Sequence, residues 1–258
     1  MPTFLFDNVV FGPVKSRRLG VSLGINLLPV DRKFCNFDCV YCECGLNESG
    51  RGTSHLPTRS GVYHALEAKL KDMQQAGETP DVITFAGNGE PTMHPEFAEI
   101  VNDTIALRNQ FFPTAAISVL SNSTMLHKTN VLEALKRVDQ NIMKLDSSLM
   151  DTIMKLNSPT GIYDVAKIIE QLESFQGKLI VQTMFTRGNV NGMWIDNTSP
   201  DDLKSLEDAL KRIKPGKVMI YTIDRDTPYQ GLQKIPKEEL MEIAQRFERL
   251  EIEVQVSA

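Results

Sequence analysis

The sequence predicts an α/β fold, a partial (β/α)6 barrel of parallel strands that is open at one side. Short β-branched runs alternate along the chain with segments that have the 3.6-residue apolar period of helices. The strand-like runs are dense in Val, Ile and Leu, which is typical of strands covered on both faces. Strands joined by helices through right-handed crossovers form a parallel sheet, and ligands bind at the carboxyl ends of its strands.

Six runs are predicted to be the strands of this sheet. They are Leu19–Leu28, Val82–Ala86, Ala115–Leu120, Asn141–Leu145, Leu179–Phe185 and Lys217–Thr222. The chain contains no linker-like or low-complexity tract and no short internal repeat. We therefore expect residues 1–258 to form a single domain.

Five segments have the apolar stripe of a helix. Thr58 is expected to cap the first, and Pro95 suits the first helical position of the second, which opens at His94. The five stripes are Val62, Leu66, Leu70 and Met73; Phe97, Ile100, Val101 and Ile105; Tyr163, Ala166, Ile169 and Leu172 within Gly161–Phe175; Leu203, Leu206, Leu210 and Ile213; and Leu240, Ile243, Ala244, Phe247 and Leu250.

The composition is that of a soluble globular protein, with 41% hydrophobic and 24% charged residues. A net charge of −5 and a pI near 5.5 argue weakly against a large nucleic-acid footprint. The start MPTFLFDNVVFG has no basic region followed by a long apolar stretch, and no run is long enough to span a membrane. We expect a cytoplasmic protein with no membrane partner.

All four cysteines fall within one short segment, CNFDCVYCEC. This clustering predicts a metal site in a reducing compartment and excludes a disulfide framework. The spacing Cys35-x3-Cys39-x2-Cys42 places three thiolates on one loop, where they can hold three corners of a 4Fe–4S cube. The fourth iron then stays open, as a catalytic metal requires.

Two alternatives concern the same cysteines. Cys44 would have to reach the cluster through an awkward C-x-C spacing and would close the open iron, so we expect it to be a small buried thiol or a loop residue. A zinc site usually has paired C-x2-C units, and the sequence offers no second pair or well-spaced His.

The pattern C-x3-C-x-aromatic-C, with Tyr41 as the aromatic residue, resembles the signature of the radical S-adenosylmethionine (SAM) superfamily. The resemblance implies a barrel of radical SAM type with residues 29–45 as the cluster loop. It also implies that the open iron binds the amino and carboxylate groups of SAM. An electron from the cluster then cleaves SAM to a 5′-deoxyadenosyl radical that abstracts hydrogen from a substrate. An external electron donor of flavodoxin or ferredoxin type would supply that electron.

The segment GNGEPT follows the second predicted strand. Its glycines allow a ligand to approach the backbone, and Glu90 offers a carboxylate there. It resembles the Gly-Gly-Glu element of the superfamily, which contacts the methionyl amine of SAM. Asn88 replaces the first glycine of that pair, so the match is Gly89, Glu90 and Pro91.

Further SAM contacts are implied at the ends of later strands. The resemblance assigns the ribose and carboxylate contacts to Ser121, Asn122 and Asp146, and backbone contacts with adenine to Tyr41. Gln182 and Met184, which share one face of the fifth strand, are additional candidates. The alternative for the polar strand ends is that they only form turns.

Three stretches resemble the iron–sulfur oxidoreductases grouped with the tRNA wyosine-synthesis enzyme, which builds an imidazoline ring on N1-methylguanosine from pyruvate. They are FGPVKSRRLGVSLGINLLP, CNFDCVYCECG and TFAGNGEPTMHPEF, and Asp224–Pro228 adds a later match. A tRNA base is therefore one expected substrate.

Other features oppose a wyosine synthase. No cysteine precedes Cys35 to bind a second cluster, no flavodoxin domain is seen, and a tRNA reader should be more basic. A peptide- or protein-modifying radical SAM enzyme is the alternative, although no cysteine-rich segment is seen after EIEVQVSA. A non-catalytic electron carrier is the third reading, which the SAM-type strand ends disfavour.

Two predicted loops are longer than such connections need: Arg187–Pro200, which carries Trp194, and Asp224–Pro236. We expect them to act as lids that shield the radical from water, the alternative being plain surface excursions. Arg17 and Arg18 precede the cluster loop and could contact a phosphate or carboxylate, or have only a solvated or structural role.

Overall fold

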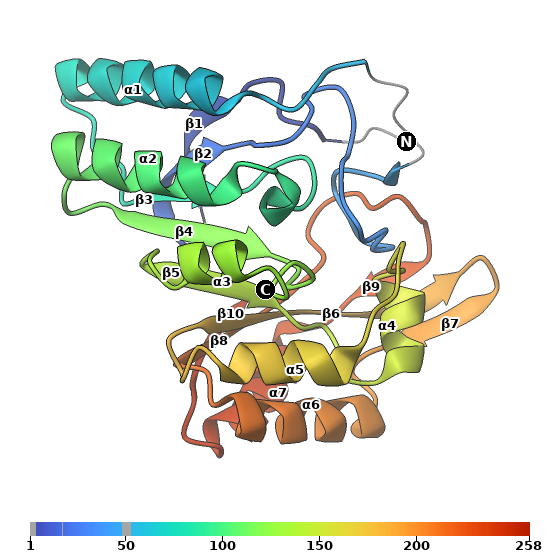
Figure 1. The fold of residues 1–258 in the computed structure, drawn as a ribbon. Coiled ribbons are helices and arrows are strands. Elements are labelled where there is room, and N and C mark those ends of the chain that lie inside the picture. Colours follow the sequence, from blue (N-terminus) through green and yellow to red (C-terminus); the bar gives the residue numbers. More distant parts are fainter. Residues whose placement is uncertain (1–3, 17, 48–52) are drawn as a thin grey trace.

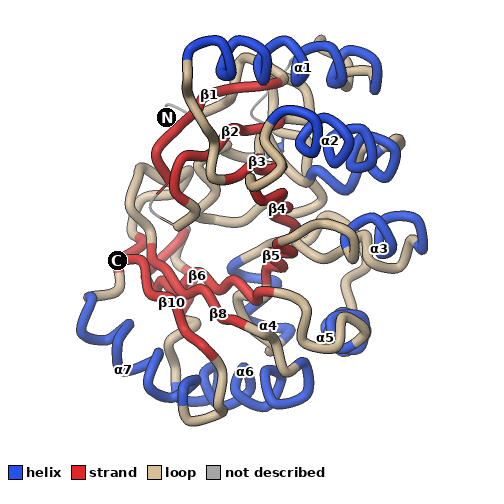
Figure 2. Tube along the Cα trace, turned by 90° about the vertical axis from the view of Figure 1, so that its left-hand side faces the viewer, coloured by secondary structure: helices blue, strands red, loops and turns tan. Residues whose placement is uncertain are grey.

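The computed structural model describes residues 4–16, 18–47 and 53–258, and within them the strands form one curved sheet. Its order is β1-β2-β3-β4-β5-β6-β8-β10. Figure 2 shows the strands as an arc with α1, α2, α6 and α7 on its outer side. The predicted partial barrel is confirmed.

The six predicted strands are all present, and each pairs parallel with its neighbours among the six. They are β2 (Gly20–Ile25), β3 (Val82–Phe85), β4 (Ala116–Ser121), β5 (Gln140–Lys144), β6 (Ile180–Val190) and β8 (Lys217–Thr222). Two edge strands were not predicted: β1 (Val10–Ser16) pairs antiparallel with β2, and β10 (Glu253–Ser257) pairs parallel with β8.

Seven α-helices lie in the described part of the chain (Figure 1). They are α1 (Arg59–Ala76), α2 (Phe97–Phe111), α3 (Thr129–Leu135), α4 (Met150–Leu156), α5 (Val165–Glu173), α6 (Pro200–Ile213) and α7 (Lys237–Glu248). Thr58 caps α1 as predicted, its hydroxyl accepting from the Gly61 N–H. The short α3 and α4 were not predicted, and α4 contacts the β6–β7 hairpin rather than joining the outer layer.

The predicted start of the second helix is wrong. A 3₁₀ helix, η2 (Pro91–Met93), comes first, and α2 begins only at Phe97. The Glu90 side chain accepts from the Thr92 N–H, so it caps η2 and puts Pro91, not Pro95, at the first helical position.

The expected loop Arg187–Pro200 is largely a β-hairpin. Strand β6 continues to Val190 and pairs with β7 (Met193–Asp196). Asn191 and Gly192 both have positive φ, as a type I′ hairpin turn requires. Within the second expected loop, β9 (Leu232–Lys234) pairs with β6 from the other side. Both segments therefore extend the sheet beyond the barrel.

The two faces of the sheet differ in polarity. Outward-facing residues such as Ile83 and Phe85 belong to the core, where Phe85 packs against Phe97 of α2. Inward-facing Thr84 lines a cavity and hydrogen-bonds to Ser22 at 2.8 Å. The helices thus cover an apolar face, whereas the face that lines the barrel interior carries polar side chains among apolar ones. No helix in the described ranges is long and apolar enough to cross a membrane.

Candidate functional site

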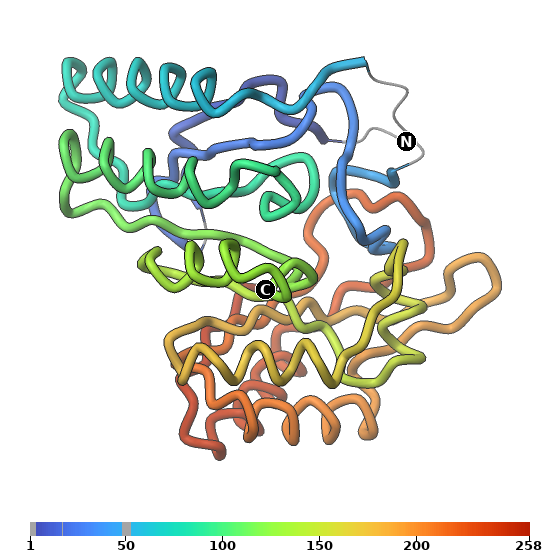
Figure 3. Tube along the Cα trace, in the orientation of Figure 1, coloured from blue at the N-terminus to red at the C-terminus, as the bar shows by residue number. Residues whose placement is uncertain are grey.

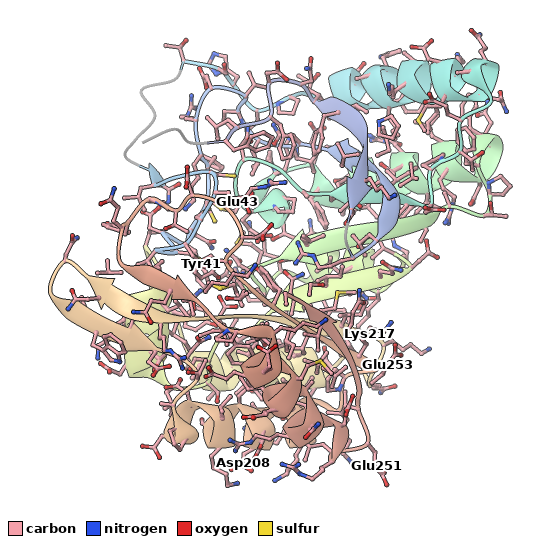
Figure 4. The ribbon with its side chains drawn as sticks, turned by 180° about the vertical axis from the view of Figure 1, so that it is seen from behind. Tyr41, Glu43, Asp208, Lys217, Glu251 and Glu253 are labelled. Carbon is pink, nitrogen blue, oxygen red and sulfur yellow. The ribbon has the colours of Figure 1, made fainter. Side chains whose placement is uncertain are left out.

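The cysteine loop follows β2 and lies over the carboxyl ends of the strands. In Figure 4, Tyr41 and Glu43 of this loop lie at the opposite end of the barrel from Lys217 and Glu253, where β8 and β10 begin. A cavity of about 300 Å³ opens at the cysteine end and is lined by residues of this loop and of several strand ends. Ligands of parallel sheets bind at this end.

Backbone hydrogen bonds hold the loop on two sides. The Phe34 N–H donates to Asn88 O at 2.7 Å, and the Glu90 N–H donates to Phe34 O at 3.2 Å. On the other side, the Val40 N–H donates to the carbonyl of Leu156, the last residue of α4, at 3.0 Å, and the Asp38 N–H donates to Ser158 O just beyond the helix at 3.1 Å. The loop is therefore held between the turn after β3 and the end of α4.

Gly89 is required by this arrangement. Its φ is +144°, and a Cβ built there would lie 1.8 Å from the carbonyl oxygen of Phe34. Only glycine accommodates both the backbone conformation and the contact.

Asn88, which replaces a family glycine, has a structural role. It is fully buried; its Oδ1 accepts from Phe6 N–H at 2.9 Å, and its Nδ2 donates to the carbonyls of Phe6 and Pro29 at 2.9 and 2.8 Å. The amide joins the N-terminal segment to the start of the cysteine loop. The departure from the family pattern therefore leaves the turn intact and adds a tether.

The three predicted cluster ligands line the cavity: Cys35, Cys39 and Cys42. None of them is in a disulfide. The Cys35 sulfur accepts from the Asn122 amide at 3.7 Å, and the Cys39 sulfur accepts from the Asn157 amide at 3.4 Å. Donors to sulfur favour the thiolate and tune iron–sulfur sites.

Lys33 supplies positive charge beside the sulfurs. Its Nζ donates to Gly45 O at 3.0 Å and to Asp38 Oδ1 at 3.2 Å. Burial opposes its charge, but the nearby cysteines and Asp38 outweigh this and raise the pKa of Lys33 to about 12. An ammonium group therefore lies next to the cysteine sulfurs.

The cysteines themselves differ in acidity. A hydrogen bond from Cys44 lowers the pKa of Cys42 to about 6 despite burial. Burial raises the pKa of Cys39 to about 11 and also raises that of Cys35. Metal binding must therefore displace protons from Cys35 and Cys39, the two thiols whose pKa is raised.

Three cysteines on one loop are the kind of donor that iron–sulfur clusters use. In the described part of the chain, no three His, Cys, Asp or Glu side chains converge closely enough to hold a single ion. A cluster takes one thiolate at each of several irons, so its ligands stand apart, and thiolates are its usual ligands. Cys44 also lines the cavity, and its Sγ lies 3.6 Å from Gly87 O.

Glu90 joins the ends of β3 and β4. Its Oε2 accepts from the Asn122 N–H at 2.6 Å, and its Oε1 accepts from the Ser121 hydroxyl at 2.9 Å and from the backbone and hydroxyl of Thr92. Burial raises the pKa of Glu90, and these hydrogen bonds oppose the rise. The carboxylate reaches the cavity wall while only 2% of the residue is exposed.

The predicted SAM residues separate into two groups. The cavity wall includes Tyr41, Gly89, Glu90, Ser121, Asn122, Gln182 and Met184. Pro91 and Asp146 do not line it. Asp146 accepts instead from the Tyr41 hydroxyl, from the Asn157 amide at 2.7 Å and from the Met184 N–H at 2.9 Å. Its carboxylate lies behind the wall and holds Tyr41 in place.

Three functional candidates were missed by sequence reasoning: Lys33, Lys144 and Asn157. Lys144 ends β5, and its Nζ lies 2.8 Å from the Tyr41 hydroxyl and 3.4 Å from Asp146 Oδ2. Burial opposes its charge, but Asp146, Tyr221 and Cys39 outweigh this and raise the pKa of Lys144. A polar strand end was the available signal for Lys144, whereas Asn157 reaches Cys39 only through the tertiary fold.

The segment after β8 reaches the mouth of the cavity. Asp224, Arg225 and Thr227 line it, and Arg225 Nη1 donates to Glu43 Oε2 at 2.7 Å. Figure 3 shows this segment running beside the cysteine loop. Trp194, on the β6–β7 hairpin, does not line the cavity and is 55% exposed.

Arg18 lines the cavity, whereas Arg17 lies outside the described residues.

Comparison with protein families gives one match, to the radical SAM superfamily, over residues 32–184. The chain belongs to the radical SAM superfamily. The matched range contains the cysteine loop, the Glu90 turn and the ends of β4 and β5. Enzymes of this superfamily use SAM and an iron–sulfur cluster, and this chain is a radical SAM enzyme.

Curated relatives include two UPF0026 proteins. That of Helicobacter pylori is 31% identical over 247 residues, which cover 94% of this chain and 74% of the relative. That of Synechocystis is 32% identical over 227 residues, which cover 86% of this chain and 77% of the relative. Neither description names a reaction.

Solved structures support the fold. A radical SAM methyltransferase from Sphaerobacter thermophilus matches with a TM-score of 0.66 at 15% identity, over 92% of this chain and 65% of that one. Streptococcus suis SuiB bound to SAM matches with a TM-score of 0.64 at 13% identity, over 91% of this chain and 50% of that one. TYW1 with a lysine–pyruvate adduct matches with a TM-score of 0.62 at 15% identity, over 88% of this chain and 73% of that one.

Replacing Gly89 tests the anchor of the cysteine loop. Gly89→Ala should lower the free energy of unfolding by about 3–5 kcal/mol, through backbone strain and the loss of the two hydrogen bonds of Phe34. Gly77→Ala is the matched control: its φ is also positive, but no atom lies within 4 Å of the added methyl group. That variant should lose only about 1–2 kcal/mol. Equal losses in urea unfolding would contradict the assigned contact.

Proposed function

We propose that Cys35, Cys39 and Cys42 hold a 4Fe–4S cluster and that SAM binds beside it. The proposed SAM contacts are Tyr41, Gly89, Glu90, Ser121, Asn122, Gln182 and Met184, with Pro91 and Asp146 positioning them from behind the wall. The observation that carries this proposal is that one cavity wall contains the cysteines together with Glu90 and the end of β4. With SAM bound, the cluster supplies the electron that cleaves SAM to methionine and the 5′-deoxyadenosyl radical.

Asn122 connects the two halves of the proposed site. Its backbone N–H donates to Glu90, and its side-chain amide donates to Asn36 Oδ1 at 2.7 Å and to the Cys35 sulfur. A shift of the SAM wall would therefore move the cluster loop with it.

Glu90 retains room for a ligand. A carboxylate has about four acceptor positions, and Oε2 accepts only from the Asn122 N–H among the described residues. A free lone pair on a buried, cavity-lining carboxylate suits the ammonium group of the methionyl part of SAM.

The segment after β8 is proposed as the lid. The ion pair between Arg225 and Glu43 ties it to the cysteine loop across the mouth of the cavity. Closing that mouth would exclude water from the radical.

For the substrate, a tRNA base in wyosine-type chemistry is the first candidate. It rests on the sequence resemblance and is supported by the likeness to TYW1, which covers most of both chains. A peptide is the second candidate, favoured by the likeness to SuiB, which has also been solved with its precursor peptide. Incubating the reconstituted enzyme with total tRNA and with peptide pools, followed by product analysis, separates the two.

We further propose that residues 1–258 act as a single radical SAM domain in the cytoplasm. Four free thiols suit a reducing compartment. An external flavodoxin- or ferredoxin-type protein would deliver the electron.

Iron content tests the cluster assignment. After anaerobic reconstitution, the chain should bind about four irons, because three thiolates suffice for a 4Fe–4S cluster with one open iron. Cys35→Ala, Cys39→Ala and Cys42→Ala should each abolish iron binding, whereas Cys44→Ala should retain it. Iron and sulfide analysis measures this. If Cys44→Ala loses iron as completely as the other three variants, the open-iron assignment is wrong.

SAM affinity tests the role of Glu90. Glu90→Gln should weaken SAM binding by about 1–3 kcal/mol, because a charge-assisted hydrogen bond is lost, while iron content stays unchanged. Glu239→Gln, which alters a carboxylate outside the cavity, is the control and should leave the affinity unchanged. Equilibrium dialysis with labelled SAM measures both. Unaltered affinity in Glu90→Gln would remove Glu90 from the SAM site.

A further inference from the structure

Arg18 enters the barrel from the end opposite to the cysteines. It lies in the turn between β1 and β2, where the Ser16 hydroxyl accepts from the N–H groups of Arg18 and Leu19 at 3.3 and 3.2 Å. Gln255 of β10 donates to the Arg18 carbonyl at 3.4 Å. The backbone is thus held at the amino ends of the strands, whereas the side chain lines the interior.

The guanidinium group of Arg18 stacks on an aromatic ring but contacts no carboxylate among the described residues. It lies 4.6 Å from the centroid of the Tyr221 ring, a cation–π contact that fixes its plane. Its Nη1 is buried and has no hydrogen-bond partner among the residues that the structure describes. A buried donor on a charged group is unfavourable unless something pairs with it.

The other cations of the same cavity wall are paired. Lys33 pairs with Asp38, Lys144 with Asp146, and Arg225 with Glu43. No salt bridge of Arg18 to a carboxylate occurs in the described ranges. Arg18 is therefore the cavity cation that is available to an anion from outside the chain.

A second cavity of about 150 Å³ adjoins the first and gives this anion a place. The residues that line both cavities are Arg18, Ala86, Leu120 and Gln182. The second cavity is mainly apolar, with Phe11, Ile142 and Met219 in its wall. It has room for on the order of five water-sized groups, so its occupant is small.

We propose that Arg18 binds the carboxylate or phosphate group of a small organic substrate in the barrel interior, on the inner side of SAM. The planar guanidinium fork matches two oxygens of either anion, and the apolar wall accepts the rest of the molecule. The proposal rests on the proposed radical SAM function. In a tRNA-modifying reaction this molecule is the co-substrate.

Calorimetry on the reconstituted chain saturated with SAM tests the proposal. The probes are propionate, inorganic phosphate and, as a neutral control, propionamide. At least one anion should bind saturably and propionamide should not; the tighter anion identifies the group. Arg18→Gln should weaken anion binding at least about tenfold, because a charge-assisted pair is lost. Arg249→Gln, at an exposed position, should leave it unchanged.

Three results would overturn the proposal: no anion binding by the wild type, equal binding by Arg18→Gln, or a loss of SAM affinity in Arg18→Gln. The last would assign Arg18 to the SAM carboxylate and leave the proposed function standing. If the wild type fails to bind SAM, the proposed function fails, and anion titration without SAM still decides the role of Arg18. Should Arg18→Gln not fold, Arg18→Lys is tested in its place. Lysine keeps the positive charge but cannot bind two oxygens through a planar guanidinium group, so this variant should weaken anion binding.

Discussion

Two backbone hydrogen bonds join Phe34 to the turn that follows β3, and they determine where the cysteines lie. Cys35 is the next residue on one side of this bridge, and Gly89 and Glu90 are on the other. The proposed iron ligand Cys35 and the proposed SAM-binding carboxylate of Glu90 are therefore positioned relative to each other by backbone contacts rather than by flexible side chains. The close approach is possible only because residue 89 has no side chain.

The barrel separates stability from chemistry. Its outer face packs an apolar core against the helices, and its inner face carries the polar and charged side chains of the site among apolar ones. Buried charges inside are paired or hydrogen-bonded, as Lys144 with Asp146 and Glu90 with Asn122 illustrate. Arg18 differs: its Nη1 has no hydrogen-bond partner among the described residues, and its side chain lines both interior cavities, which is why we propose a binding role for it.

Strongly periodic segments were predictable from the sequence, and contacts distant in sequence were not. The six barrel strands and the Thr58 cap follow from local pattern. Strand β10 was missed because its sequence EVQVS alternates polar and apolar residues instead of forming an apolar run. The Asn191-Gly192 turn was available as a hairpin signal but was not used. Of the candidate site, the motif picked out the cysteines and Glu90, which line one cavity. It could not show that Asp146 accepts a hydrogen bond from Tyr41 and lies behind the cavity wall, because that depends on a tertiary contact.

The central claim is that SAM binds directly to a cluster held by the cysteine loop. Electron–nuclear double resonance on the dithionite-reduced, reconstituted chain, with SAM labelled with ¹⁵N at the methionyl amine, tests it most directly. The account predicts a ¹⁵N coupling and a cluster signal that changes when SAM is added. An identical signal with and without SAM, and no ¹⁵N coupling, would contradict it.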